Sequence, residues 1–308
     1  MKAYLELREA LGVHVQQFKS RLESFVQYLE QHADGTQIRA RFAVDWACNT
    51  SPGCGIPGRS ARLSIARGFL IHLKATYPQV EVPDNKLIAT KRRPTPYLFS
   101  DKEIKNLMAA AGQLSPRDSL RPHTHQTLLG LLACTGLRSG EAVNLLVSDI
   151  HLDGSPACLF IRNAKFHKSR WVPLHPTAAD QLSHYAKLRS DLNYASLPDV
   201  FFISEQGRQL DGRILRRTFR RLLNLARIYP RPDQRYPSLH SFRHTFAVER
   251  LRRWYQAGAD TRTLLPHLSV YLGHVDPAES YWYLTATPEL MGASAELFQN
   301  YAQKRGGI

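Results

Sequence analysis

The sequence Ser238-Leu239-His240-Ser241-Phe242-Arg243-His244 opens the stretch that decides the fold, and Leu272-Gly273-His274 and Tyr281-Trp282-Tyr283 follow it. If Ser238 caps a helix, His240 and Arg243 fall on one face, because residues three apart are neighbours on a helix surface. Leu239 and Phe242 then lie on the other side and can enter a core. The stretch contains no cluster of carboxylates or cysteines, so we expect no metal ion in its chemistry.

The bulk composition points to a basic protein with more than one domain. The chain has 308 residues, of which 43% are hydrophobic, enough for two domains with cores of their own. Its formal net charge is +15 and its pI is about 9.9. A basic balance of this size favours a polyanionic partner, most simply nucleic acid, over a charge that serves only solubility.

The cysteines and the apolar runs indicate the compartment. Cys48, Cys54, Cys134 and Cys158 form no C-x-x-C pair, so we expect free thiols in a reducing compartment. The N-terminus lacks the apolar core of a signal peptide, and the longest apolar run, near Leu128–Cys134, is too short to cross a bilayer. The glycine-rich loop of ATP-binding proteins is also missing. We expect a cytoplasmic protein, nucleoid-associated when bound to DNA, with no cofactor and no membrane partner.

Residues 1–82 are expected to form a small all-helical domain. Apolar residues at helical spacing predict helices at about Val13–His32, Thr36–Cys48 and Ser60–Ala75, the last capped by Ser60. Basic residues near the start of the third helix are Arg59, Arg62 and Arg67. They form either a solvated face or a DNA contact, and we favour the DNA contact because the whole chain is basic.

Residues 83–98 are interpreted as a linker between two domains. The segment contains three prolines and the run Lys91-Arg92-Arg93. Arg92 and Arg93 can cross a phosphate backbone, although a flexible tether would have a similar composition.

Residues 99–308 are expected to form a second domain, and the chain as a whole is predicted to be mainly helical with a small antiparallel sheet. Ser100 and Glu103 have the spacing of a capping box at the start of this domain. A buried helix near Leu128–Cys134 ends at a glycine, and Arg138 follows. Glu141 lies three residues further on, so its carboxylate can hold the Arg138 guanidinium in place.

The rest of the second domain is predicted to alternate short strands and helices. Predicted strands are Ala157–Ile161, Trp171–Leu174 and Val200–Ser204, and predicted helices are Pro176–Leu188, Arg213–Arg227 and a last amphipathic segment over Met291–Tyr301. Ile214, Leu215, Leu222 and Leu225 form the expected apolar side of the Arg213–Arg227 helix. Its other side is crowded by Arg213, Arg216, Arg217, Arg220 and Arg221. This density favours phosphate or groove contact over a solvated face.

The dispersed basic residues and the tyrosine suit phosphoryl transfer. Arg138 and Arg243 can each give paired hydrogen bonds to phosphate oxygens. A tyrosine hydroxyl, with an unperturbed pKa of about 10, needs a base such as His240 to act as a nucleophile. A lysine from the loop Asn163–Ser169 can protonate the leaving 5′ oxygen. The covalent phosphotyrosyl bond would store the energy of the broken phosphodiester, so resealing needs no nucleotide cofactor. Taken singly, each of these residues is more often structural.

Four linked motifs follow one another in the second domain. They are Thr135-Gly136-Leu137-Arg138-Ser139-Gly140-Glu141, Lys165 in a hairpin ending Val172-Pro173-Leu174, Leu239-His240-Ser241-Phe242-Arg243-His244-Thr245, and Leu272-Gly273-His274 with a tyrosine nine residues on. Together they resemble the tyrosine recombinases, also called the phage integrase family, over the whole second domain. The first domain resembles the family's helical core-binding domain less specifically. The segments 281–288 and 93–97 look most like members carried by transposons and other mobile elements.

The resemblance implies an enzyme that cuts and rejoins DNA strands at specific sites through a 3′-phosphotyrosyl bond, for integration, excision or transposition of a mobile element. It implies a homotetramer on two DNA duplexes, with companion recombinases or accessory DNA-bending proteins as further partners. The segment after Thr285 would pack onto a neighbouring subunit. The implied catalytic residues are Arg138 and Arg243 as a phosphate clamp, Lys165 as general acid, His240 as base or phosphate contact, His274 as hydrogen-bond donor and Tyr283 as nucleophile.

Two residue assignments and two alternative functions stay open. The family spacing favours Tyr283 over Tyr281, and only one of the two can face the site, since they are two residues apart on a helix. Alignment on the hairpin's end favours Lys165 over Lys168, which would then be a DNA contact. A type IB-like topoisomerase would share this chemistry, and a DNA-binding protein without cleavage activity would share the basic surface.

Overall fold

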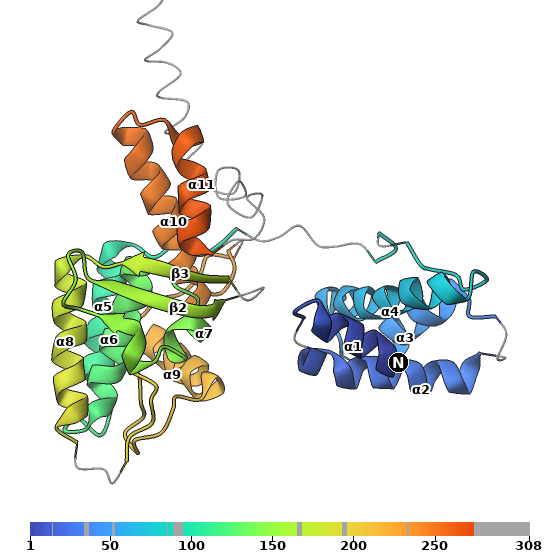
Figure 1. The fold of residues 1–308 in the computed structure, drawn as a ribbon, viewed down its shortest axis with the longest axis horizontal. Coiled ribbons are helices and arrows are strands. Elements are labelled where there is room, and N and C mark those ends of the chain that lie inside the picture. The colour runs from blue at the N-terminus through green and yellow to red at the C-terminus, as the bar shows by residue number, and fades with distance from the viewer. Residues whose placement is uncertain are drawn as a thin grey trace, which may run out of the picture. The chain divides into compact units, whose positions relative to one another are not determined.

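The computed structural model describes residues 1–13, 15–33, 37–50, 53–84, 86–88, 95–164, 168–192, 196–232 and 234–273. The chain divides into two compact units, Met1–Arg93 and Pro94–Ile308 (Figure 1). Both units are mainly helical, and the second contains a three-stranded antiparallel sheet, so the predicted fold class is confirmed. Within the described part of the chain, every helix is too short or too polar to cross a lipid bilayer.

The described residues of the first unit form four α-helices and a short 3-10 turn at Val15–Gln17. The helices are α1 at Lys2–Ala10, α2 at Lys19–His32, α3 at Ala40–Asn49 and α4 at Ile56–Thr76. Helix α1 was not predicted, and α2 begins later than expected because Gly12, at φ +74°, and the 3-10 turn interrupt the helical pattern. Ser60 does not cap α4, since Pro57 occupies its first turn and Gly55 precedes it.

The core of the first unit forms around Trp46 of α3. Trp46 and Phe25 of α2 are fully buried, and their ring centroids lie 5.0 Å apart. Leu63 and Leu70 of α4 are buried in the same cluster. The three longer helices therefore share one small apolar core, as the helical spacing of their apolar residues requires.

The second unit contains seven helices among the residues that the structure describes. They are α5 at Asp101–Gly112, α6 at Leu120–Thr135, α7 at Ser139–Val143, α8 at Pro176–Ser190, α9 at Gly212–Leu225, α10 at Leu239–Gln256 and α11 at Thr261–Leu272. The capping box at the start of α5 is confirmed: the Ser100 hydroxyl accepts from the Glu103 N–H at 3.3 Å, and the Glu103 carboxylate accepts from the Ser100 N–H at 2.8 Å. The predicted segment Met291–Tyr301 lies outside the described residues.

The sheet has the strand order β1-β2-β3, with β1 at Ile150–His151, β2 at Cys158–Ala164 and β3 at Lys168–Pro173. Strands β2 and β3 were predicted, although both extend further towards their connection than expected, and β1 was not predicted. The expectation of a strand at Val200–Ser204 was wrong. Its residues form only isolated bridges to two different partners, and the apolar side chains that suggested a strand pack into the helical core.

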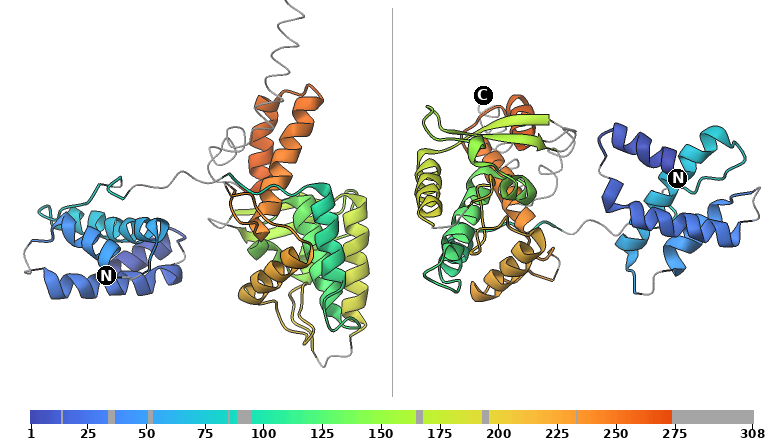
Figure 2. Two further views of the ribbon diagram at one scale, coloured as in Figure 1. Left: turned by 180° about the vertical axis from the view of Figure 1, so that it is seen from behind. Right: turned by 60° about the horizontal axis from the view of Figure 1, so that its bottom comes forward.

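Helix α10 is anchored by two different apolar clusters, one at its start and one along its later turns. Near its start, the Phe242 ring lies 4.8 Å from the Phe99 ring and 5.8 Å from the Phe219 ring of α9, measured between centroids. Its later turns, through Val248 and Leu251, form a separate apolar cluster with α11, and Figures 1 and 2 show the two helices side by side. The start of α10 is thus fixed against the end of α11.

The apolar side of α9 differs in part from the expectation. Leu215 and Leu222 are buried as predicted, but Ile214 and Leu225 are 51% and 56% exposed. Phe219 completes the buried stripe instead. The buried stripe follows the 3.6-residue helical period that starts at Leu215. The two exposed residues do not fall on this period.

Truncation of Phe242 to alanine tests the anchoring of α10. Phe242 is fully buried, so Phe242→Ala should lower the free energy of unfolding by about 3–5 kcal/mol. Tyr229→Ala, at a residue that is 62% exposed, should change it by less than about 0.5 kcal/mol. Urea unfolding followed by circular dichroism measures both, and equal effects would show that the α10 start is not part of the core.

Candidate active site

The first part of the site forms where α6 ends. Gly136 terminates α6 with a φ of +63°, and Arg138 occupies the position before α7. The Glu141 carboxylate accepts from the Arg138 backbone N–H at 3.0 Å and from Arg138 Nη1 at 2.8 Å. The prediction that Glu141 holds the Arg138 guanidinium is therefore confirmed.

A second arginine, Arg170 of β3, shares the Glu141 carboxylate. Arg170 Nη2 lies 2.8 Å from Glu141 Oε2, and Nη1 lies 3.2 Å from Oε1. The two side chains are only 9% and 8% exposed. Burial alone would raise the pKa of the Glu141 carboxyl, but hydrogen bonds and charges from Arg170 and Arg138 outweigh it, so this pKa is lowered and the group stays ionised.

Three arginines bind three successive backbone carbonyls at the end of α11. Arg170 Nε donates to the Tyr271 oxygen at 2.8 Å. Arg243 Nη2 donates to the Leu272 oxygen at 2.6 Å, and Arg138 Nη2 donates to the Gly273 oxygen at 3.0 Å. The last carbonyls of a helix lack partners within it and carry partial negative charge. The arginines satisfy these oxygens and fix the backbone at 271–273.

Arg243 also joins the ends of two helices. Its Nη1 donates to the Gly136 oxygen at 3.0 Å, and the residue is only 1% exposed. At Gly136 and Gly273, whose neighbourhood includes these arginine contacts, the structure leaves no room for a side chain. A Cβ on Gly136 would lie 2.7 Å from the Phe246 ring, and one on Gly273, at φ +68°, would lie 2.7 Å from Arg170 Nη1.

His240 lies in a cationic environment in the first turn of α10. Although part of the side chain reaches solvent, the pKa of His240 is lowered to about 4, with burial of the ring as the largest cause. The positive charges of Arg243, Arg138 and Arg235 contribute to this lower pKa in that order. The imidazole is therefore neutral at pH 7 and can accept a proton or a hydrogen bond.

The structure brings together three of the six predicted catalytic residues, namely Arg138, His240 and Arg243. Lys165, His274 and Tyr283 lie outside the described residues, as does the alternative nucleophile Tyr281. Lys168 lies on β3, but its side chain is not described. The described backbone ends at Gly273, whose carbonyl binds Arg138, so His274 directly follows an anchored residue.

The arginines predicted as DNA contacts in the first unit also make bonds within it. Arg59 Nε donates to the Cys54 oxygen at 2.9 Å, and Arg67 Nε donates to the Pro83 oxygen at 3.1 Å. The Arg62 guanidinium lies 3.9 Å from the centroid of the buried Trp46 ring. All three therefore support the fold of this unit. Arg92 and Arg93 lie outside the described residues.

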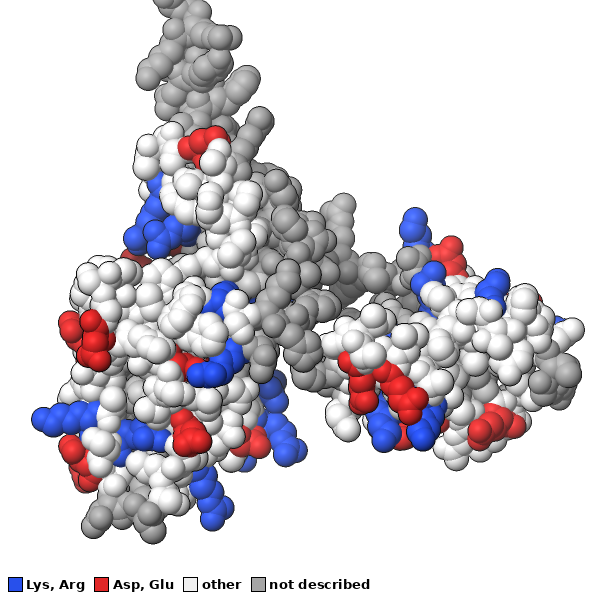
Figure 3. Space-filling model, in the orientation of Figure 1, with Lys and Arg blue, Asp and Glu red and all other residues white. Residues whose placement is uncertain are grey.

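The α9 arginines are exposed, as their position opposite the apolar stripe requires. These residues are Arg213, Arg216, Arg217, Arg220 and Arg221. On the face shown in Figure 3, the basic side chains of the second unit form several separate groups. A distributed basic surface of this kind suits an extended anion better than a small one.

Sequence reasoning missed Arg170, although the sequence contained a signal for it. Strand residues two apart share a face, so Arg170 lies on the same side of β3 as Val172, which is fully buried. A charged residue on a core-facing position requires a buried partner. The identity of that partner, Glu141, depends on the tertiary fold.

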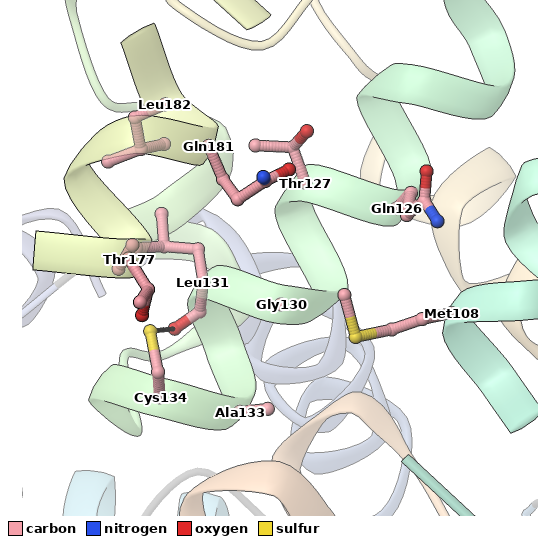
Figure 4. A pocket seen from close by; sticks show the side chains of 11 residues that line it. Met108, Gln126, Thr127, Gly130, Leu131, Ala133, Cys134, Thr177, Gln181 and Leu182 are labelled. Atoms are coloured by element: carbon pink, nitrogen blue, oxygen red, sulfur yellow. Dashed lines mark hydrogen bonds between the residues drawn. The ribbon is translucent and has the colours of Figure 1, made fainter. Parts of the chain in front are cut away.

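An apolar hollow lies elsewhere, between α5, α6 and α8 (Figure 4). It has a volume of about 290 Å³, and Met108, Leu131 and Leu182 are among its lining residues. Its one ionisable lining residue within the described chain is Cys134. Although Cys134 is partly exposed, burial of the thiol raises its pKa to about 11, which keeps it protonated at neutral pH. The hollow therefore offers no nucleophile or base.

Replacement of Glu141 tests the network through its pH dependence. Glu141→Gln leaves Arg170 buried without a counterion and should lower the free energy of unfolding by about 3–5 kcal/mol at pH 7. Because the folded pKa of Glu141 is depressed, its contribution is complete above the unfolded pKa of about 4.3 and is lost as the pH falls through the folded pKa.

The stabilities of wild type and Glu141→Gln should thus begin to approach each other below about pH 4 and converge below the folded pKa of Glu141, as measured by urea unfolding at several pH values. Asp153→Asn makes the same carboxylate-to-amide change on an exposed residue and should alter stability little at any pH. If the difference in unfolding free energy between wild type and Glu141→Gln does not vary with pH, the lowered pKa of Glu141 is contradicted.

Comparison with known proteins places these observations in a family. The sequence model of the Phage integrase family matches residues 98–289 of this chain. The chain is 38% identical over 297 residues to the putative integrase/recombinase y4rB of Sinorhizobium fredii, covering 94% of this chain and 93% of that protein. It is 28% identical over 275 residues to the tyrosine recombinase XerD of Caulobacter vibrioides, covering 89% and 84%.

Solved structures show the same fold at low sequence identity. The XerH site-specific recombinase bound to palindromic difH substrate has a TM-score of 0.68 at 17% identity, covering 97% of this chain and 83% of that one. The Tn1549 transposon integrase in complex with transposon right end DNA has a TM-score of 0.66 at 14% identity, covering 96% and 98%. With the four motifs and the converging arginines, these matches identify the chain as a member of the phage integrase family of tyrosine recombinases.

Proposed function

We propose that this protein is a site-specific recombinase that integrates, excises or transposes a mobile element by cutting and rejoining DNA strands. The observation that carries the proposal is the convergence of Arg138 and Arg243 on adjacent carbonyls beside a neutral His240. Fixed cations at one point are suited to the charged oxygens of a phosphoryl-transfer transition state. The relatives named integrase/recombinase support the cellular role.

In the cleavage step, the Tyr283 hydroxyl oxygen attacks the phosphorus and the bond from phosphorus to the 5′ oxygen breaks. The tyrosine proton passes to His240, and Lys165 gives a proton to the leaving 5′ oxygen. The product is a 3′-phosphotyrosyl bond and a free 5′ hydroxyl. Attack by a 5′ hydroxyl from another strand reverses these transfers and reseals the DNA. No nucleotide or metal takes part in this sequence.

The electrostatic environment of His240 supports its proposed role as proton acceptor. A histidine with a pKa of about 4 is neutral at pH 7 but is a weak base. A bound phosphate brings negative charge close to the arginines that depress this pKa. The phosphate thus offsets the part of the lowering that comes from the arginines, while the part that comes from burial stays, so binding of the substrate raises the pKa of His240 and strengthens the base.

The burial of Arg243 implies a movement on DNA binding. The residue is 1% exposed in the chain without DNA, and a phosphate oxygen must come within hydrogen-bond distance of its guanidinium. Residues that cover Arg243 therefore shift when the substrate binds. Arg138, whose side chain is 25% exposed, is the more accessible of the two arginines and would contact the phosphate first.

The partners follow from the same proposal. Double-stranded DNA at the ends of the element would be the substrate, and a homotetramer on two duplexes would carry out the exchange. A solved lambda integrase tetramer bound to a Holliday junction, with the same fold, supports this assembly. Residues 1–82 would act as a core-binding domain, 83–98 as a linker and 99–308 as the catalytic domain, and the protein would work in the cytoplasm.

Substitution of the two tyrosines tests the nucleophile. Wild-type protein should form a covalent adduct with a nicked duplex taken from the element ends, because the nick lets the 5′ product diffuse away. Tyr283→Phe should form none, since only its hydroxyl oxygen becomes bonded to phosphorus. Tyr281→Phe is the matched control and should keep the adduct, which denaturing gel electrophoresis detects. An adduct that persists in Tyr283→Phe would refute the assignment.

The same assays separate the alternative functions. Relaxation of supercoiled plasmid that lacks the element ends, without formation of a complex between two duplexes, would favour a type IB-like topoisomerase. Binding of the element ends without any adduct in wild type would favour a DNA-binding protein that has lost cleavage.

A further inference from the structure

A second basic site adjoins the arginine cluster, at a pocket of about 340 Å³. Its walls come from the start of α7, from α9 and from the residues that lead into α10. Ser139, which follows Arg138 in sequence, and His240 both line it. The pocket is therefore directly beside the position proposed for the scissile phosphate.

Three arginines line this pocket: Arg216 and Arg220 of α9, and Arg235 before α10. The two α9 residues were predicted from the sequence as DNA contacts, whereas no role was predicted for Arg235. Of the α9 arginines, Arg216 and Arg220 line the pocket, and Arg235 lines it with them. Among the lining residues that the structure describes, none is acidic.

The pocket arginines differ from those of the active site in their bonding. Arg138 and Arg243 donate to protein acceptors. Within the described part of the chain, no hydrogen bond or ion pair holds the guanidiniums of Arg216, Arg220 or Arg235. Their donors face one hollow and their like charges repel one another, so an anion bound between them would be stabilised by all three.

The floor of the pocket favours a nucleotide unit over a free small anion. Phe219 and Leu239 line it and are only 2% and 5% exposed, while Tyr236 at its rim is 47% exposed. Apolar and aromatic surface next to cations suits a sugar or base attached to a phosphate. A solvated basic face would instead be convex and would not require these side chains to surround a hollow.

We propose that this pocket binds a backbone phosphate of the cleaved DNA strand, one or two nucleotides from the scissile phosphate, through Arg216, Arg220 and Arg235. Successive nucleotides of one strand rise by about 3.4 Å, so a strand held at Arg138 and His240 passes the pocket within this range. The identity of the ligand as DNA rests on the proposed function. The pocket fixes the register of the strand, while the active site acts on one bond.

The first test measures DNA affinity against salt concentration. The probe is a fluorescein-labelled 30-base-pair duplex from the element end. Arg235→Gln should weaken binding by about tenfold and lower the slope of log affinity against log salt by about 1. Arg235→Lys keeps the charge and should restore the slope while losing the paired hydrogen bonds.

Arg117→Gln is the matched control, because it removes the same charge from an exposed residue before α6, whereas Arg138 follows the far end of that helix. The 16 residues of α6 separate the two sites by about 24 Å. Affinity and slope should stay as in wild type. Equal losses in Arg235→Gln and Arg117→Gln, or no loss in either, would overturn the proposal.

The second test locates the contact. Neutral methylphosphonate groups are placed one at a time along the cleaved strand of the same duplex. Wild type should lose affinity at one phosphate near the cleavage position, and Arg235→Gln should be insensitive at that phosphate alone. If methylphosphonate substitution lowers the affinity of both proteins equally at every position, the proposal that this pocket binds a phosphate is overturned. The adduct assay reports on the proposed function separately, so loss of the adduct with an intact binding pattern would refute cleavage but keep the pocket.

Discussion

One buried carboxylate organises the basic side chains of this protein. Glu141 binds Arg138 and Arg170 together, and without it the buried Arg170 and the partly exposed Arg138 would lie side by side without a counterion, at a large cost in free energy. Thus held, these two arginines and Arg243 reach three successive carbonyls at the end of α11. The arrangement ties the α6–α7 turn, β3, α10 and α11 to one point.

This constraint links folding to the proposed chemistry. The residues that bind a phosphate must be positioned before the substrate arrives, because a misplacement of about 1 Å can reduce a rate about 100-fold. Arg138 and Arg243 are oriented by their bonds to the protein. Burial of the ring, and after it the charges of these arginines, lower the pKa of His240 to about 4. The same bonds fix the backbone at Gly273, from which the chain continues to His274. Arg170 is a positioning residue in this arrangement, since it acts through Glu141 and the Tyr271 carbonyl.

Local rules predicted what local contacts determine. The Arg138–Glu141 pair lies three residues apart, and the capping box of α5 has the same separation, so sequence spacing was enough for both. The contact of Arg170 with Tyr271 joins residues 101 positions apart, and no local pattern specifies it. The strand alternation contained a signal that Arg170 lies on a buried face, which was not used, but it contained no signal for what Arg170 binds. The burial of Arg243 likewise depends on how α11 returns to α6, which is a property of the tertiary fold.

The most direct test of this account is the single-turnover rate at which Arg170→Gln cleaves a nicked element-end duplex, counted per molecule of bound DNA. Counting bound molecules removes the contribution of any unfolded fraction. Arg170 makes no contact with the substrate in this account, so affinity should stay within about twofold while the cleavage rate falls by about 100-fold through misplacement of the active-site groups. A rate per bound duplex equal to that of wild type would contradict the claim that the Glu141–arginine network positions the site.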